Sequence, residues 1–191
     1  MQGRSYLIAA VIGGTLAGSG CTSPAPKGAP EQATLASETS TALVAFKNDD
    51  PSLQALIDKS VGYAVFPEVG KAGFIAGASY GNGEVFERGR KIGYADITQG
   101  SFGLQAGAQT FGELILFLRQ EDLNAFKENS FSLSANLSAV AIKSGAAAAT
   151  DTSKGVIVFV RAKGGLMAEA SVGGQRFRFK PLNGGTTQPA Q

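Results

Sequence analysis

The chain has 191 residues, of which 43% are hydrophobic and 17% are charged, and its formal net charge is +2. This length allows one domain with a hydrophobic core, and so small a net charge does not indicate a nucleic-acid-binding protein. The chain has no histidine and a single cysteine, Cys21, which excludes a Ser-His-Asp or Cys-His catalytic arrangement and an intramolecular disulfide. Its 26 glycines, about twice an average share of roughly 7%, favour a turn-rich β fold over a helix bundle.

Residues 1–20 have the pattern of a secretory signal peptide. Arg4 supplies the positive start, Tyr6–Leu16 the apolar run, and Ala17–Gly20 the small residues at the exit. The apolar run is shorter than the roughly 20 residues that a transmembrane helix needs. Cys21 follows directly, as at a bacterial lipoprotein processing site, so we expect an acylated (palmitate-bearing) cysteine on an exported, membrane-anchored protein. The alternative is an ordinary signal peptide that leaves a free thiol near the cut.

The residues after the cysteine indicate a tether that leads to the domain. Thr22 follows Cys21 where an aspartate would favour the inner membrane, so we expect the anchor to lie in the outer membrane and to face the periplasm. Three prolines among small residues make residues 21–34 a flexible linker. We therefore expect the domain itself to span residues 35–183 and a polar, disordered tail to span residues 184–191.

Two helices are predicted at the start of the domain. Apolar residues recur at steps of three and four along Glu31–Lys47. Asp50 and Pro51 then provide the cap and first-turn proline of a second helix, whose apolar face carries Leu53, Leu56 and Ile57. We expect both helices to cover a β-barrel. The alternative, a helix lying on a membrane surface, is less favoured because neither helix has a basic polar face.

A strand-rich pattern follows the helices. Asn82-Gly83 predicts a two-residue hairpin turn that pairs Lys71–Tyr80 with Glu84–Arg88, and Arg88–Lys91 predicts the next turn. Gln120–Asn129 is predicted as a short helix, and Ser144–Lys154 as either a mobile loop or a helical turn. Further strands are expected over Ile92–Thr98 before a break at Gln99–Ser101, and over Phe102–Thr110, Leu114–Leu118, Phe131–Lys143, Gly155–Val160, Leu166–Val172 and Gln175–Leu182.

The element count predicts the fold class. Seven to nine short strands against three helices indicate an α+β fold. Closing the sheet would remove its exposed edges, so we expect a small antiparallel β-barrel with about three helices packed on its outside.

Several segments resemble the SYLF domain family. Phe66–Phe74, with Gly77 and Tyr80–Gly83 after it, is similar to the opening signature of that family, and Gly103–Gln109 to its Gly-x-Gln-x-Gly-Ala strand. Leu114–Leu118 and Lys163–Gly174 resemble the apolar run and the closing segment that follow. These four segments keep the family's order, and the likeness covers approximately Leu35 to Leu182. The resemblance implies binding of lipids, including phosphoinositides, and in yeast members of actin.

One departure from the family pattern bears on the branch. The eukaryotic members carry Trp-Ser-Ala-Pro-like residues where this chain reads Tyr94–Thr98. This difference favours a bacterial lipoprotein branch, and we do not expect actin as a partner.

The candidate site is a cluster of basic residues. If the predicted hairpin forms, Lys71, Arg88, Arg90 and Lys91 share one end of the barrel, and Arg161 and Lys163 join them from another turn. Such cations would contact anionic phospholipid headgroups, each contributing about 1 kcal/mol. A competing basic stripe lies along the last strand, with Arg176, Arg178 and Lys180 on one side and Phe177 and Phe179 on the other. The alternative for either set is a solvated surface without a ligand.

The function expected from these features is non-enzymatic. We expect a lipid-binding domain of an envelope lipoprotein that binds anionic headgroups weakly and uses no cofactor or metal. One alternative is a structural lipoprotein that contacts an envelope protein and needs no lipid ligand. A remote alternative is a hydrolase that uses two carboxylates among Glu68, Glu87, Asp96 and Glu113. Nucleic acid is not an expected partner.

Overall fold

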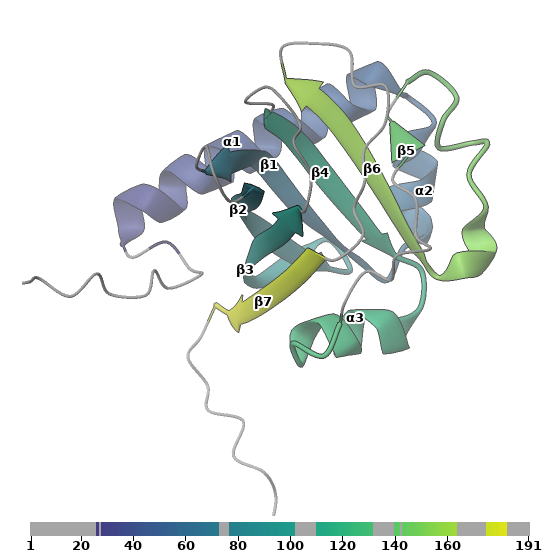
Figure 1. The fold of residues 1–191 in the computed structure, drawn as a ribbon. Coiled ribbons are helices and arrows are strands. Elements are labelled where there is room, and N and C mark those ends of the chain that lie inside the picture. The colour runs from purple at the N-terminus through teal and green to yellow at the C-terminus, as the bar shows by residue number, and fades with distance from the viewer. Residues whose placement is uncertain are drawn as a thin grey trace, which may run out of the picture.

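The computed structural model describes residue 26 and residues 28–72, 77–101, 110–131, 140–141, 143–163 and 175–182. Within them the chain folds into one curved sheet with helices on both of its faces (Figure 1). The α+β class predicted from the sequence is confirmed. The predicted signal peptide, Cys21 and C-terminal tail lie outside the described residues, as do the predicted strand over Leu166–Val172 and most of those over Phe102–Thr110 and Phe131–Lys143.

The predicted helices are present. α1 begins two residues before the predicted helix, and its Pro30 lies in the first turn, where a missing N–H leaves no intrahelical bond unmade. None of the helices in the described ranges has the length and apolar character needed to cross a bilayer. The helices are α1 (Ala29–Asp49), α2 (Leu53–Lys59), α3 (Gln120–Lys127) and the short 3₁₀ turn η1 (Thr152–Lys154).

Asp50 joins the first two helices to a distant part of the chain. Its side chain accepts hydrogen bonds from the N–H (3.0 Å) and hydroxyl (2.6 Å) of Ser52 before α2, and from the N–H of Ala147 (2.7 Å). The residue is fully buried. Burial raises the pKa of Asp50, but these hydrogen bonds together outweigh it and hold the pKa below its ordinary value. The cap position of α2 is Ser52 and not Asp50 as predicted, and Asp50 instead holds the turns over residues 144–149 against the helices.

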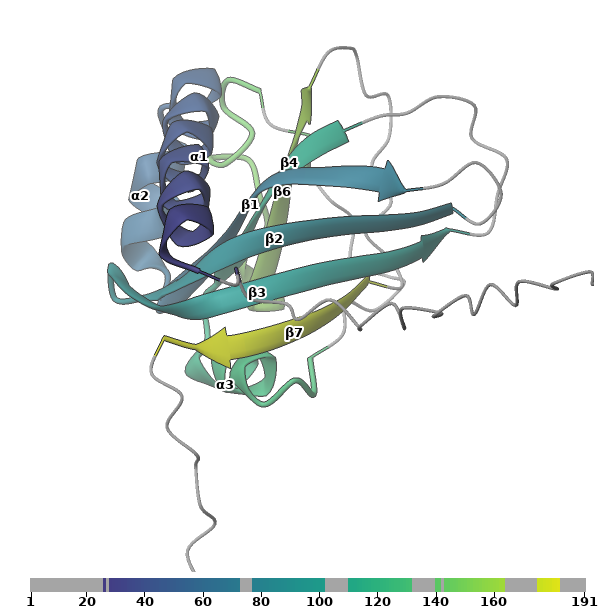
Figure 2. The same ribbon diagram turned by 90° about the vertical axis from the view of Figure 1, so that its left-hand side faces the viewer.

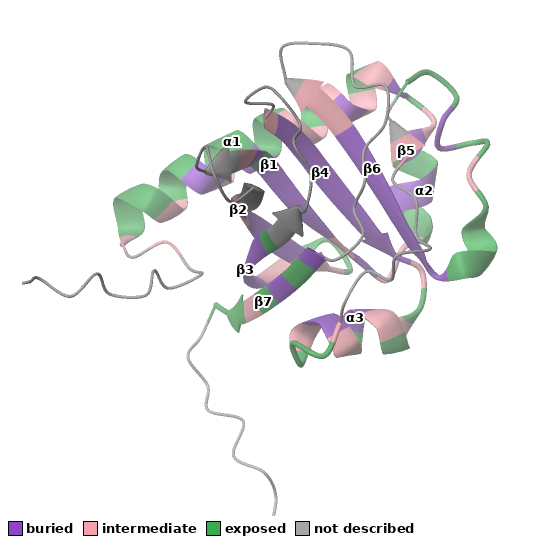
Figure 3. Ribbon diagram, viewed as in Figure 1, coloured by how far each residue is buried: buried purple, intermediate pink, exposed green. Residues whose placement is uncertain are grey.

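The described strands form one sheet in the order β5-β6-β4-β1-β2-β3-β7. Every neighbouring pair is antiparallel except β5 and β6, which run parallel. The central strands are buried along most of their length (Figure 3). The strands are β1 (Gly62–Ala72), β2 (Gly77–Glu87), β3 (Arg90–Ser101), β4 (Thr110–Phe117), β5 (Val140–Ala141), β6 (Val156–Lys163) and β7 (Gln175–Pro181).

The two faces of the sheet carry separate apolar cores. α1 and α2 cover one face, where Phe46 and Leu53 pack against Leu114 and Phe159. On the other face α3 lies next to β7 (Figure 2). A second core cluster, which includes Phe66 and Ile115, faces that side. Helices therefore cover the sheet, as the apolar periodicity of the first two segments predicts.

The sheet is open in the described residues, so the predicted closed barrel is not what forms there. Its edge strands β5 and β7 pair with β6 and β3, not with each other. Between the two arms of the curved sheet, the ring of Phe126 on α3 lies 5.1 Å from that of Phe117 on β4 and 5.3 Å from that of Phe177 on β7. Aromatic contacts through α3 thus complete the core in place of strand pairing.

The predicted hairpin turn at Asn82-Gly83 is wrong, because both residues lie inside β2. β2 pairs with β1, whose register shifts between Val65 and Glu68. A Cβ atom on Gly83 would lie 2.5 Å from the carbonyl oxygen of Val65 and 2.6 Å from Cδ1 of Phe66. The glycine is therefore required for close approach to this irregular part of β1, and not for a turn.

The next predicted turn is confirmed. Arg88 (φ 50°) and Gly89 (φ 75°) form a two-residue connection between β2 and β3, with Glu87 paired to Arg90. Positive φ at both residues is typical of a type I′ hairpin. The break predicted at Gln99–Ser101 is wrong, since these residues continue β3.

A buried polar pair joins β4 to β7 on the α3 face. Nε2 of Gln175 donates to Oε2 of Glu113 over 2.9 Å, and both side chains are fully buried. Burial raises the pKa of Glu113 to about 8, and the hydrogen bond from Gln175 opposes this only in part. At neutral pH the folded protein therefore holds this carboxyl in its protonated, uncharged form.

We predict that Gly83→Ala lowers the free energy of unfolding by on the order of 1–3 kcal/mol, because the added methyl group would overlap backbone of β1. Gly70→Ala is the matched control, since its Cβ would meet only Cγ2 of Thr110 at 3.4 Å. Urea denaturation followed by circular dichroism measures both variants. Equal losses of stability would contradict the close-approach argument.

We predict that the free energy of unfolding falls as the pH rises from about 4.5 to about 8. The folded protein keeps the proton of Glu113 in this window, whereas the unfolded chain releases it near 4.5. The slope attributable to this group is at most about 1.4 kcal/mol per pH unit. Denaturation curves between pH 4 and 9 should show this slope in the parent and a flatter one in Glu113→Gln. Parallel pH profiles would contradict the assignment.

Candidate functional site

The predicted basic cluster is divided between the two ends of the sheet. In the β1–β2 pair, Gly62 lies opposite Glu87 and Lys71 lies opposite Ser79. Lys71 is thus nine residues along β1 from the end next to the Arg88 turn, about 30 Å at roughly 3.4 Å per residue. The expectation that Lys71 lies beside Arg88 and Arg90 is wrong, because the chain reverses after Ala72 and not at Asn82-Gly83.

Lys163 and Arg161 also lie away from the Arg88 turn. Lys163 pairs with Thr110 at the end of the sheet where Lys71 lies. The side chains of Lys71 and Lys163 are outside what the structure describes. The Nε of Arg161 contacts Oδ2 of Asp49 at 2.5 Å, so this guanidinium fastens β6 to the last turn of α1.

Lys91 lies beside the Arg88 turn but is held by its own partner. Its Nζ donates to Oε1 of Glu84 over 2.8 Å and lies 5.2 Å from the centre of the Tyr94 ring. The Glu84 side chain is 3% exposed. The hydrogen bond to Glu84 raises the pKa of Lys91 above its ordinary value. Lys91 is therefore a structural cation that neutralises a buried carboxylate.

The competing basic stripe is present as predicted. Arg176, Arg178 and Lys180 are exposed on β7, whereas Phe177 is buried and Phe179 half-buried on its other side. In the β3–β7 pair these three residues lie opposite Thr98, Asp96 and Tyr94. The alternation that predicted this strand from the sequence therefore describes its two faces correctly.

The stripe and the β2–β3 turn lie along one side of the sheet, and together we call them the basic edge. Lys180 lies opposite Tyr94, which is four residues, or about 13 Å, along β3 from Arg90. From the position of Arg176 to the turn the edge measures about 27 Å. The basic edge consists of Arg88, Arg90, Arg176, Arg178 and Lys180, all of them exposed.

Carboxylates near the basic edge already have partners within the protein. Asp96 is almost fully buried, and its Oδ2 lies 3.3 Å from Nη2 of Arg178. Burial raises the pKa of Asp96, and the charge of Arg178 opposes that shift. Glu87 accepts hydrogen bonds from Gln120 and from Lys127, which hold its pKa below the ordinary value. In the described part of the chain, no salt bridge engages the remaining four cations of the edge.

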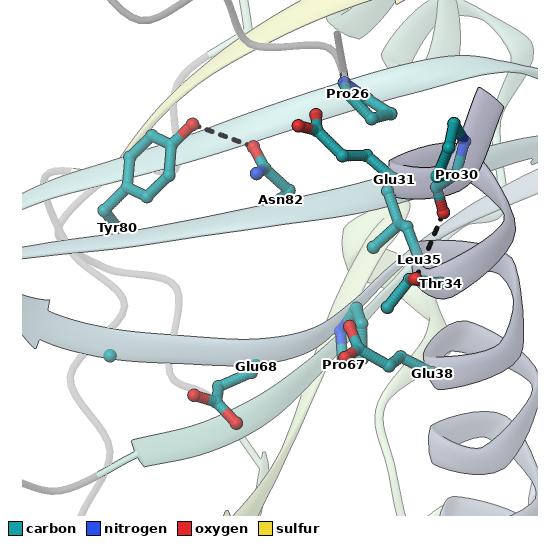
Figure 4. A pocket seen from close by; sticks show the side chains of 11 residues that line it. Pro26, Pro30, Glu31, Thr34, Leu35, Glu38, Pro67, Glu68, Tyr80 and Asn82 are labelled. Carbon is teal, nitrogen blue, oxygen red and sulfur yellow. Dashed lines mark hydrogen bonds between the residues drawn. The ribbon is translucent and has the colours of Figure 1, made fainter. Parts of the chain in front are cut away.

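The second candidate surface is a groove along α1, which sequence patterns did not predict. Its larger hollow, of about 700 Å³, lies between the first half of α1 and the strands β1 and β2 (Figure 4). Tyr80 donates its hydroxyl hydrogen to Oδ1 of Asn82 over 2.8 Å on the strand side. The carboxylates that line this hollow are Glu31, Glu38 and Glu68. The groove depends on how a helix packs on a sheet, so no local pattern reveals it.

The carboxylates weighed for a hydrolase do not share one place. Glu113 faces the α3 side with Gln175, and Glu87 contacts α3 beside the β2–β3 turn. Glu68 and Asp96 lie on either side of Asn82 across three neighbouring strands, about 10 Å apart at the backbone. The structure therefore brings no pair among these four residues together at one hollow.

Comparison with known proteins shows what the chain is similar to. The sequence model of the Ysc84 family, described as "Las17-binding protein actin regulator", matches residues 98–181. Beta cell expansion factor A from Aeromonas veronii is 27% identical over 138 residues, which cover 72% of this chain and 52% of that protein. The chain thus matches about half the length of this relative. These findings confirm the resemblance predicted from the sequence: residues 98–181 match the model of the Ysc84, or SYLF, domain family.

Proposed function

We propose that this chain is a non-enzymatic domain that binds anionic phospholipid surfaces through its basic edge. The observation that supports the proposal best is the row of exposed cations along β7, which continues to the β2–β3 turn. The expectation from the sequence was lipid binding through a cluster that included Lys71 and Lys163. The geometry favours a smaller, differently composed surface for the same chemistry.

The strand β7 is suited to present cations to a surface. Alternate residues of a strand point to the same side and repeat about every 7 Å, so Arg176, Arg178 and Lys180 form a regular row. The opposite side of the strand is fixed by Phe177, whose ring contacts those of Phe66 and Phe126. Arginine can bind a phosphate through two parallel hydrogen bonds, which makes it the stronger headgroup ligand of the two basic residue types.

The positive charge of the basic edge acts over a short range. Lys91 pairs with Glu84 and Lys127 with Glu87, so each of these two carboxylates already has a lysine partner beside the exposed cations. Each basic residue near an anionic bilayer contributes about 1 kcal/mol, and the attraction falls off within a Debye length of about 10 Å at 0.1 M salt. The proposal therefore describes weak, salt-dependent binding, to phosphatidylglycerol-type or phosphoinositide headgroups alike.

An acylated Cys21 would supply the second membrane signal that weak electrostatic binding requires. Pro26 lines the groove at the start of α1, and it follows Cys21 by five residues. Five extended residues span at most about 18 Å, so the anchor would keep this end of the domain near the bilayer. We propose an envelope lipoprotein that faces the periplasm from the outer membrane.

We predict that Arg176→Ala/Lys180→Ala and Arg88→Ala/Arg90→Ala each weaken binding to vesicles containing anionic lipid by about 30-fold, since each removes two cations. Co-sedimentation of the purified chain with anionic and with neutral vesicles measures this. The four residues are exposed and hold no described salt bridge, so the fold should be unaffected. Lys91 and Arg178 stay unchanged, because their loss would leave Glu84 or Asp96 buried without a partner.

The matched control is Lys143→Ala/Lys154→Ala, which removes the same charge from exposed positions next to β5 and β6, at the edge of the sheet opposite β7. It should bind anionic vesicles nearly as well as the parent. If all three double variants lose binding equally, net charge and not the edge is responsible, and the proposed site is rejected. Equal binding of the parent to anionic and neutral vesicles would favour the alternative, an envelope lipoprotein that contacts a protein partner.

We predict that the mature protein begins at Cys21 and carries acyl chains on it. Mass spectrometry of the N-terminal peptide from the membrane fraction of a bacterial expression host measures this directly. Cys21→Ser should leave the protein without acyl chains and release it from that fraction. An unmodified thiol at Cys21 in the mature protein would contradict the lipoprotein assignment. It would not bear on the basic edge, which the vesicle-binding experiment tests separately.

A further inference from the structure

The groove along α1 consists of two hollows that join. Glu38 and Pro67 line both the larger hollow, of about 700 Å³, and a smaller one of about 220 Å³ next to it. From Glu31 in the larger hollow to Ala45 in the smaller one, α1 rises by about 21 Å at 1.5 Å per residue. The two hollows therefore adjoin at Glu38 and Pro67 and lie one after the other along the helix; together we call them the α1 groove.

The smaller hollow is mostly apolar. Ala42, Ala45 and Phe46 line it from α1, and Gly112 from β4 leaves its floor without a side chain. Arg161 lines its far end, but the ion pair with Asp49 already neutralises that guanidinium. An apolar cavity of about 150 Å³ can bind benzene, so a hollow of about 220 Å³ has room for a hydrocarbon group of about six to eight carbons. This end of the groove therefore suits a short hydrocarbon chain.

The larger hollow has the opposite character. Glu31, Glu38 and Glu68 line it, and no lysine or arginine is among the described residues that do so. Glu31 and Glu68 each interact with another group of the protein. The favourable position for a ligand cation is therefore the Glu38 carboxylate. Glu38 is exposed and lies where the two hollows meet. A charged group held there would place its apolar part in the smaller hollow.

We propose that the α1 groove binds a cationic amphiphile: a primary ammonium group on an unbranched alkyl chain of about six to eight carbons. The ammonium group lies at the Glu38 carboxylate, and the alkyl chain fills the hollow between Ala45 and Gly112. Charge complementarity selects the head, and the small residues select a narrow tail. This site is separate from the basic edge, and its charge preference is the reverse.

The test compares three small probes on the full chain, each below its micelle-forming concentration. Octylammonium has both head and tail, octanoate has the same tail with the opposite charge, and ethylammonium has the head without the tail. Isothermal titration calorimetry should show saturable binding of octylammonium and at least tenfold weaker binding of the other two. Equal binding of octanoate would overturn the assignment of the head, and equal binding of ethylammonium would overturn that of the tail.

Two variants test the two halves of the groove. Ala45→Leu fills the smaller hollow, and Glu38→Gln removes the charge at the junction; each should weaken octylammonium binding by tenfold or more. Glu121→Gln, an exposed carboxylate on α3, is the matched control and should bind like the parent. Circular dichroism and thermal melting confirm the fold of each. If Ala45→Leu and Glu38→Gln bind octylammonium like the control, the proposal is wrong, whatever vesicle binding shows.

Discussion

The close approach of β2 to the irregular part of β1 is the contact on which the functional surfaces depend. At Phe66-Pro67 the register of β1 shifts, and Gly81 and Gly83 of β2 leave no side chain in the way. A Cβ on Gly81 would lie 2.6 Å from the carbonyl oxygen of Glu68. This packing pairs Glu68 with Asn82 and places Pro67 in the wall of both hollows of the α1 groove. A different register would move each of these side chains to the other face of the sheet.

Local patterns in the sequence were sufficient where a residue's surroundings are set by its neighbours in the chain. The helix before Asp50, the turn at Arg88-Gly89 and the alternation along β7 were all predicted correctly, because periodicity and turn chemistry decide them. The turn at Asn82-Gly83 was predicted by the same rule and is wrong. There, packing against β1 decides the conformation. The sequence does not distinguish a glycine that is needed for space from one that is needed for positive φ. The described strands do not close into the predicted barrel, and α3 completes their core with Phe126, which a strand count does not reveal.

The candidate site shows the same division between local and tertiary information. The sequence supplies a set of basic residues, but not which of them already have partners. Lys91, Arg161 and Arg178 each contact a carboxylate, and Glu84 and Asp96 are almost fully buried. A buried carboxylate left without its partner is strongly unfavourable, so these cations serve the fold first. The strand register places the β2–β3 turn beside the end of β7. This arrangement brings together the exposed cations that have no such structural role.

One row of paired residues links the two surfaces. Glu68, Asn82, Asp96 and Arg178 lie in register across β1, β2, β3 and β7, a distance of about 14 Å at roughly 4.8 Å between strands. The row begins in the carboxylate-lined groove under α1 and ends at the basic edge. One face of the sheet thus changes from negative to positive over less than two Debye lengths at 0.1 M salt. A formal net charge of +2 conceals this separation, because it sums charges that the fold sorts onto different surfaces. Since the larger hollow of the α1 groove is lined by carboxylates and the basic edge by cations, each can attract a ligand that the other repels.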